Sequence, residues 1–262
     1  MRPKTIAIAN QKGGVGKTTT AINLGAALAM RGFRTLLIDL DPQGNASTGM
    51  GVARDIRRRS TYDLLLGEES AADIALSTDV DNLRIIPATM DLSSADSELM
   101  ASSRRVIHLR NALRLRETPF DYILIDCPPS LNLLTINAFV AAHSILVPLQ
   151  AEFFALEGLS QLLLTVREVR STANSDLRLE GIVLTMFDKR NNLCQQVEDD
   201  ARENLGDLVF DTKIPRNVRL SEAPSYAMPV LNYDPTSRGA IAYRSLATEL
   251  LQRNRSEAPA DV

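Results

Sequence analysis

The sequence has few cysteines, the residues that stabilise many secreted proteins through disulfides and many small domains through structural zinc. Among its 262 residues there are only two cysteines, Cys127 and Cys194. They do not form a Cys-X-X-Cys pair, which argues against a disulfide scaffold and against a structural zinc site. The composition therefore fits a protein of a reduced, cytosolic compartment.

Long apolar runs and an excess of positive charge are also missing. No hydrophobic stretch approaches the roughly 20 residues that a membrane-spanning helix needs, and residues 1–4 lead directly into a strand-like run that leaves no room for a signal peptide. The formal net charge is −3, so any nucleic-acid site must be a local patch. Hydrophobic residues make up 45% of the chain, which is enough for a sizeable core.

Short β-rich segments alternate with helical patterns along the whole chain. Near-continuous apolar runs, typical of parallel strands covered on both faces, predict strands at residues 5–9, 35–39, 83–87, 122–126, 144–148 and 181–186. Shorter candidate strands lie at 212–214 and 230–231, and helices are predicted at 18–31, 158–171, 195–205 and 238–253. This alternation predicts an α/β fold with a doubly wound, mostly parallel twisted sheet and helices on both faces.

The chain shows no sign of division into several domains. There is no internal repeat and no Gly/Ser-rich linker, so residues 1–253 are predicted to form a single domain. The polar segments 50–62 and 91–105 are expected to be loops or peripheral helices. The last helix should bury a stripe of Ile241, Leu246, Leu250 and Leu251, and the polar tail 254–262 is predicted to be disordered.

A glycine-rich segment, QKGGVGKTTT at residues 11–20, lies between the first predicted strand and the first predicted helix. Glycines let backbone N–H groups turn toward phosphate oxygens, and the helix start adds its positive dipole end. Lys17 is expected to reach the β- and γ-phosphates, and Thr18 to place its hydroxyl on Mg²⁺. Gln11 occupies the first position of the strict pattern GxxxxGK[ST], so the alternative is a glycine-rich turn that binds no phosphate.

Carboxylates follow two of the predicted strands. Asp126 ends the apolar run FDYILID and is placed as a Walker B residue near the metal. Asp39 and Asp41 end the run LLIDLD, and one of them can polarise the attacking water. The alternative is that they cap a helix or form the turn before Pro42, and the residues alone do not decide between these interpretations.

The motifs QKGGVGKTT, LIDLDPQGN and YILIDCPPS, in this order and spacing, resemble the deviant-Walker P-loop ATPases. The later segments PLQAEFFALEG, LTMFDKR, IPRNVRLSEAP and YDPTSRG are similar to the ParA/Soj-type chromosome partitioning ATPases, and the likeness covers roughly residues 4–250. The nitrogenase iron protein fits less well because its cluster ligands have no counterpart, so Cys127 is expected to be a small buried residue. MinD-type ATPases end in a basic amphipathic helix that docks on membranes, and the tail after Arg253 is polar.

The resemblance implies a Mg²⁺-dependent ATP hydrolase, weak without its partner, that acts in the cytoplasm on the nucleoid. It assigns the phosphate loop to Gly13, Gly14, Val15, Gly16, Lys17, Thr18 and Thr19. It implies that Lys12 reaches across an ATP-dependent sandwich homodimer to the phosphates bound by the partner subunit. Asp41 would then orient the water, and Asp126 would lie with Thr18 near Mg²⁺. Glu152 would approach the ribose or the partner's nucleotide, and Pro215 and Asn217 would border the adenine.

The resemblance also implies two macromolecular partners, a ParB-type centromere-binding protein and double-stranded DNA bound without sequence preference, and no membrane. Arg190 and Arg219 match the DNA-contacting arginines of the family. Lys189, Lys213 and Arg216 lie in the same two segments, and a dimer would double the patch. Residues 57–59, a run of three arginines, are the alternative DNA surface. The alternative functions are a MinD-like membrane-positioning ATPase and a nucleotide-gated repressor with little turnover.

Overall fold

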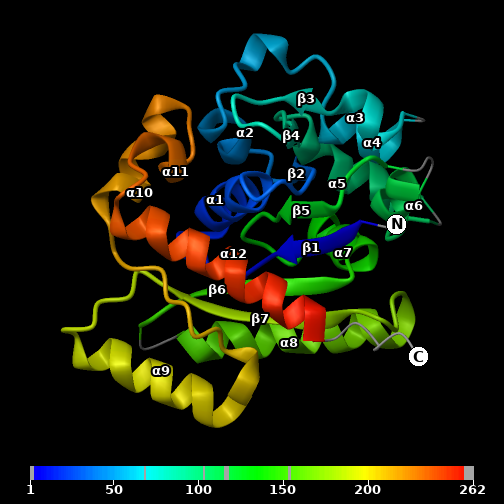
Figure 1. Ribbon diagram of the computed structural model, residues 1–262. Helices are drawn as coiled ribbons and strands as arrows, with labels where there is room; N and C mark the ends of the chain where they lie inside the picture. Colours follow the sequence, from blue (N-terminus) through cyan, green and yellow to red (C-terminus); the bar gives the residue numbers. More distant parts are fainter. Residues whose placement is uncertain (1–2, 68, 103, 115–117, 153–154, 257–262) are drawn as a thin grey trace, which may run out of the picture.

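The computed structural model describes residues 3–256 except 68, 103, 115–117 and 153–154 (Figure 1). The described residues form a seven-stranded sheet in the order β3-β4-β2-β5-β1-β6-β7. Neighbouring strands are parallel except for the short β3, which pairs antiparallel with β4. The strands are β1 Lys4–Ile8, β2 Thr35–Asp39, β3 Leu76–Ser77, β4 Leu83–Ile86, β5 Tyr122–Asp126, β6 Ser144–Gln150 and β7 Arg178–Thr185. The α/β fold with a mostly parallel sheet is therefore confirmed.

Helices cover both faces of this sheet. The α-helices of the described residues are α1 Lys17–Ala29, α2 Asn45–Gly49, α3 Thr61–Leu66, α4 Ala71–Ile74, α5 Leu92–Met100, α6 His108–Arg114, α7 Leu133–Ala141, α8 Ala155–Thr172, α9 Asn192–Leu205, α10 Val218–Glu222, α11 Val230–Tyr233 and α12 Arg238–Ser256. Among the same residues, no helix is both long and apolar enough to cross a bilayer.

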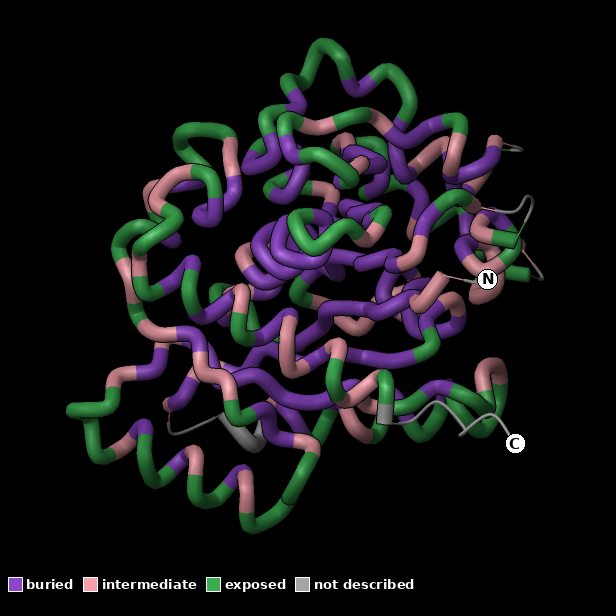
Figure 2. The backbone as a smooth tube through the Cα atoms, viewed as in Figure 1, coloured by how far each residue is buried: buried purple, intermediate pink, exposed green. Residues whose placement is uncertain are grey.

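Two hydrophobic layers hold the helices on the sheet. Successive side chains of a strand point to opposite faces, so Ile6 and Ile8 pack with α1 and α12 while Ala7 packs with α7 and α8 on the other face. Figure 2 shows that the buried residues follow the sheet and α1, which is buried from Thr20 to Ala29. The phosphate-loop helix is thus enclosed between the sheet and α12 (Figure 1).

The six main predicted strands are present, with ends shifted by a few residues, but both short candidates are wrong. Residues 230–231 begin α11, where the backbone N–H of Val230 donates to Asn23 Oδ1 (2.8 Å). Residues 212–214 form no strand. The segment meets the sheet edge through isolated bridges at Val209 and Pro215 and through single backbone hydrogen bonds, such as that from the N–H of Ile214 to the carbonyl of Leu184 (2.8 Å). The two-residue β3 is too short for its pattern to be detected.

The C-terminal helix differs from the prediction in its buried stripe and in its end. Ile241 is 51% exposed, and Tyr243, which is 1% exposed, takes the buried place instead. Leu246 and Leu250 are buried as predicted. The helix continues to Ser256, so the first residues of the tail predicted to be disordered are helical, and residues 257–262 lie outside the described part. Both cysteines are unpaired and buried, as expected for Cys127.

Candidate active site

The phosphate loop connects the end of β1 to the start of α1 and is fixed at both ends. Asn10 is buried; its Nδ2 donates to the carbonyl of Pro148 (2.8 Å) and its Oδ1 accepts from the N–H of Lys12 (2.9 Å). At the other end, the hydroxyl of Thr185 donates to the carbonyl of Val15 (2.8 Å). Gly14 and Gly16 have φ angles of 74° and 89°, a left-handed conformation that glycine adopts without strain. The loop therefore curves away from the strand on a rigid frame.

Lys17 begins α1 and is 7% exposed. Its Nζ donates to the carbonyl of Lys12 (2.8 Å), across the loop. Burial lowers the pKa of this ammonium, and the carboxylates of Asp126 and Asp41 act in the opposite direction. The Lys17 ammonium is thus buried, near carboxylates, and bonded to a loop carbonyl. A phosphate group that binds in the loop can accept stronger, charge-assisted hydrogen bonds from it.

Asp126 ends β5 directly beside Asp39 of β2 in the strand register. It is fully buried, and among the described residues neither carboxylate oxygen lies within hydrogen-bonding geometry of a donor. Burial raises its pKa well above the ordinary value and the charge of Asp39 adds to this, whereas the nearby hydroxyl of Thr18 acts against it. A buried carboxylate without donors is costly unless it meets a cation.

This arrangement fits a magnesium ion held jointly by protein and nucleotide. Mg²⁺ is bound by one or two protein oxygens together with substrate phosphates and waters, rather than by an all-protein cage. Thr18 and Asp126 would supply those oxygens. Within the described part of the chain, no group of three or more His, Cys, Asp or Glu side chains is placed to hold a metal ion.

The geometry separates Asp39 from Asp41. Asp39 is fully buried and accepts three hydrogen bonds, from the N–H (2.8 Å) and hydroxyl (2.6 Å) of Ser47 and from the N–H of Asp41 (3.2 Å). Its burial, partly offset by these bonds, raises its pKa to about 6. Asp41 lies past the strand end, where its Oδ1 accepts from the N–H of Gln43 (3.0 Å). Asp39 thus anchors α2, while Asp41 keeps Oδ2 without a donor among the described residues.

Lys12 and Glu152 lie together at the rim of the site. The Lys12 ammonium forms an ion pair with Glu152 Oε1, and the two side chains are 43% and 33% exposed. Glu152 follows β6, which borders β1, so the fold places both residues beside the phosphate loop. Two residues that the sequence assigned to nucleotide contacts are therefore partners of each other in the single chain.

A cavity of about 500 Å³ adjoins the phosphate loop. Gly16 of the loop and Thr19 of its helix line this cavity, and so do Pro215 and Asn217. Its lining also includes Tyr243 of α12, whose OH is 3.1 Å from the hydroxyl of Thr20. Tyr243 was not among the residues predicted for the site. A tyrosine within the apolar stripe of the last helix is the sequence signal that could have indicated it. A largely apolar pocket of this size is suited to a nucleobase.

The predicted DNA-contacting cations are exposed but not free of partners. The Arg190 side chain is 91% exposed and pairs with Asp188 (3.1 Å). Arg219 is 51% exposed and pairs with Glu222 (2.8 Å) and with Asp234 (3.3 Å). The expectation that Lys213 adds to the patch is weakened, because its ammonium pairs with Glu198 and lies over the Phe187 ring.

Comparisons with known proteins agree with this geometry. Residues 3–179 match the AAA_31 family model, described as an AAA domain. The chain is 55% identical over 254 residues to the chromosome partitioning protein ParA of Caulobacter vibrioides, covering 96% of this chain and 95% of that protein. It is 53% identical over 247 residues to the sporulation initiation inhibitor protein Soj of Bacillus subtilis, covering 94% and 98%.

A solved structure with bound nucleotide is also similar. Cobyrinic acid a,c-diamide synthase from Mycobacterium smegmatis with bound ADP and magnesium has a TM-score of 0.84 and 38% identity, covering 97% of this chain and 96% of that one. The family similarity inferred from the motifs is thereby confirmed. With a buried P-loop lysine, two strand-end aspartates and full-length identity above one half to curated partitioning proteins, the chain belongs to the ParA/Soj family of chromosome partitioning ATPases.

Proposed function

We propose that this chain is a Mg²⁺-dependent ATP hydrolase that drives DNA segregation in the cytoplasm, on the nucleoid. ATP would produce a sandwich dimer that holds double-stranded DNA without reading its sequence, and a ParB-type partner would stimulate hydrolysis and release the dimer. The observation that carries the proposal is the fully buried Asp126 carboxylate, which has no hydrogen-bond donor among the residues that the structure describes and lies near Lys17 and Thr18 at the start of α1.

Each residue of the phosphate loop has a physical task in this reaction. The backbone N–H groups of residues 13–19 and the dipole of α1 would bind the phosphate oxygens. The Lys17 ammonium would give up its hydrogen bond to the Lys12 carbonyl and donate to the β- and γ-phosphates instead. Thr18 and Asp126 would hold Mg²⁺, and a bound Mg²⁺ would neutralise negative charge on the β- and γ-phosphate oxygens.

Asp41 is the better of the two candidates for orienting the attacking water. The oxygens of Asp39 are occupied by Ser47 and by the Asp41 N–H, and Asp39 is completely enclosed. Asp41 is 9% exposed and keeps an oxygen available at the edge of the site. A carboxylate oxygen that can accept a hydrogen bond from water would fix the direction of its attack on the γ-phosphate.

The remaining contacts follow from the rim of the site. Pro215 and Asn217 would border the adenine in the cavity next to the loop. Lys12 would leave Glu152 and stabilise the γ-phosphate charge of the partner subunit's nucleotide, as an arginine finger does in trans. Glu152 would then be available to the ribose. Hydrolysis by a single chain would be slow because this cation would act only on the nucleotide of the partner subunit.

Two substitutions test the proposal together. We expect Lys17→Ala to abolish ATP binding in calorimetric titrations with Mg²⁺, because the polyphosphate loses its main cation. We expect Asp41→Ala to bind ATP and to dimerise by light scattering, but to lose turnover. Lys189→Ala, which removes an exposed lysine, is the control and should bind ATP normally. Wild-type ATP affinity in Lys17→Ala, or normal turnover in Asp41→Ala, would contradict the assignment.

A further inference from the structure

Arg57 is the first of three consecutive arginines, and it differs from the other two in its burial. Arg58 and Arg59 are exposed, whereas Arg57 is 8% exposed. Its burial removes Arg57 from any DNA surface formed by residues 57–59. A guanidinium carries five N–H donors, and enclosing it is costly unless these donors find acceptors.

The Arg57 guanidinium donates to acceptors from separate parts of the chain. Nε and Nη2 donate to the carbonyl of Val52 (3.1 and 2.8 Å), and Nη2 also donates to the hydroxyl of Thr48 (2.8 Å). Nη1 donates to the carbonyl of Ala88 (3.1 Å) and more weakly to that of Gly44 (3.5 Å). Every acceptor in this set is neutral, so these hydrogen bonds connect separate segments of the chain. Burial lowers the pKa of Arg57, and the negative charge of Asp39 acts against this lowering.

One of the connected segments is the turn that carries Asp41. The N–H of Gly44 donates to the carbonyl of Asp41 (2.9 Å), and Gln43 donates to its carboxylate, so residues 41–44 form one compact turn. Gly44 closes the turn at a φ of 65°. A Cβ at this position would overlap the Arg57 guanidinium, so the arginine lies directly against the turn.

A second connected segment follows the end of β4. Ala88 follows this strand, and its N–H donates to the hydroxyl of Ser47 (2.9 Å), which in turn donates to Asp39. The Ala88 carbonyl is held by Arg57. The N–H of Ala88 thus holds the start of α2 through Ser47, and the carbonyl of Ala88 holds the turn before α2 through Arg57.

We propose that Arg57 is a positioning residue for ATP hydrolysis, which sets the Asp41 turn against the end of β4 so that the carboxylate faces the γ-phosphate. The inference rests on the water-orienting role proposed for Asp41. A lysine keeps the positive charge but has three donors on one atom in place of a planar fork, so it cannot join Val52, Ala88 and Thr48 simultaneously.

The test compares Arg57→Lys with Arg58→Lys, the same change one residue further in the exposed part of the run. For Arg57→Lys we expect ATP turnover at saturating ATP and Mg²⁺ to fall about 10- to 100-fold, the size of effect that a misplaced catalytic group produces. ATP affinity by calorimetry should stay within about threefold, because no phosphate-loop residue is changed. Arg58→Lys should match wild type in both measurements.

Two further measurements separate positioning from a general loss of stability. Amide hydrogen exchange of a peptide covering residues 40–50 should accelerate in Arg57→Lys, while peptides from β5 and α1 stay protected. Gly44→Ala, which crowds the guanidinium and also strains the turn at its φ of 65°, should likewise lower turnover with ATP affinity retained. Parallel losses of ATP affinity and of protection throughout the chain would overturn the inference in favour of a merely structural role.

Asp41→Ala is measured in the same series. Normal turnover in Asp41→Ala would overturn the role of Asp41 and this inference with it. Normal turnover in Arg57→Lys beside an inactive Asp41→Ala would overturn only the inference about Arg57.

Discussion

At the residue scale, Lys12 has a different partner in the single chain from the one that its proposed role requires. It pairs with Glu152 at the rim, where both side chains remain partly exposed. Such solvated ion pairs contribute only about 0–1 kcal/mol. A triphosphate carries several charges and accepts stronger, charge-assisted hydrogen bonds, so a partner's nucleotide can replace Glu152 at low cost.

We expect Lys12→Ala to bind ATP with nearly normal affinity and to lose the turnover that the partner protein stimulates, because its ammonium is proposed to act on the nucleotide of the other subunit. The measurement is ATPase rate with DNA and the partner protein, and mixtures with wild type should give intermediate rates. Arg170→Ala, which removes an exposed cation at the end of α8, outside the proposed DNA patch, serves as control. If Lys12→Ala alone hydrolyses ATP at the wild-type rate, the proposed action in trans is wrong.

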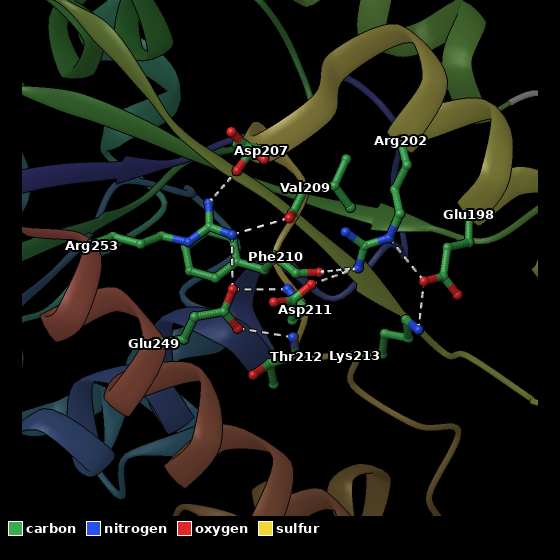
Figure 3. Close-up of polar contacts among 10 residues, drawn as sticks. All are labelled: Glu198, Arg202, Asp207, Val209, Phe210, Asp211, Thr212, Lys213, Glu249 and Arg253. Carbon is green, nitrogen blue, oxygen red and sulfur yellow. Dashed lines mark hydrogen bonds and ion pairs between the residues drawn. The ribbon is translucent and has the colours of Figure 1, made fainter.

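At the scale of elements, side chains of α9 and α12 add to a few backbone hydrogen bonds with β7 in fastening the segment that follows α9 (Figure 3). Glu249 of α12 accepts from the N–H groups of Asp211 (2.8 Å) and Thr212 (2.9 Å). The Arg253 guanidinium lies 4.0 Å from the centre of the Phe210 ring and pairs with Glu249. Because Glu249 takes the N–H groups of Asp211 and Thr212, the backbone hydrogen bonds from Phe210 and Ile214 to β7 are not joined into a continuous ladder, and residues 212–214 do not form the predicted strand.

Figure 3 shows that the same segment is also tied to α9. Arg202 pairs with Glu198 and with Asp211 (both 3.1 Å), and Lys213 pairs with Glu198. The chain then continues to Pro215 and the cavity beside the phosphate loop. The two anchors therefore hold in place the segment to which the adenine contacts are assigned.

We expect Glu249→Gln to lower the free energy of unfolding at pH 7 by about 1.5–3 kcal/mol, the range for hydrogen bonds to a charged group. Burial acts to raise the pKa of Glu249, but the N–H groups of Asp211 and Thr212 and the Arg253 cation outweigh it and leave the pKa below its ordinary value of 4.5. The carboxylate therefore stabilises the fold above about pH 4.5, and this contribution is lost as pH falls through the lowered pKa.

Urea unfolding of wild type and Glu249→Gln at pH 7 and at lower pH measures this difference, which should shrink in acid. Glu203→Gln changes an exposed carboxylate on α9 and should have little effect at any pH. A constant difference between wild type and Glu249→Gln from pH 7 down to pH 3 would contradict the proposed role of the charge.

At the scale of the whole molecule, a protein of net charge −3 is proposed to hold a polyanion. Arg190 and Arg219 must leave, or share, their own carboxylate partners to do so. These pairs are solvated and therefore weak. A dimer presents every cation twice. Each phosphate contact also releases counterions from the DNA. A small local patch can therefore bind DNA without an overall basic charge on the protein.

We expect Arg219→Glu, and less severely Arg190→Glu, to weaken DNA binding by the ATP-bound dimer while ATP binding and dimerisation persist. Phosphate contacts carry no sequence information, so the loss should be similar on two unrelated duplexes. The slope of log K against log salt should become shallower by about 0.9 for each phosphate contact that is lost.

Arg170→Glu makes the same charge change at the exposed end of α8 and should preserve the salt slope. An unchanged affinity and slope in Arg219→Glu would place the DNA surface elsewhere. Arg58 and Arg59 would then be the remaining candidates in the run at residues 57–59, since Arg57 is buried.

The sequence by itself determined the features that depend on local pattern. Apolar runs between turns located the six main strands, and the spacing of glycines, Lys17 and Thr18 located the phosphate loop at the first strand–helix junction. Asp126 could be placed near that loop because the carboxyl ends of parallel strands meet at one edge. Such inferences need only the nearest neighbours in the chain and the general geometry of an α/β sheet.

Only the tertiary structure decided which of several similar residues is enclosed and which partner each one has. Arg57 and Arg58 look alike in the sequence, yet carbonyl groups from distant segments enclose the first and leave the second in water. Tyr243 rather than Ile241 is buried because of how α12 lies on α1. Burial and pairing are set by contacts between residues far apart in the chain, where local periodicity carries no information.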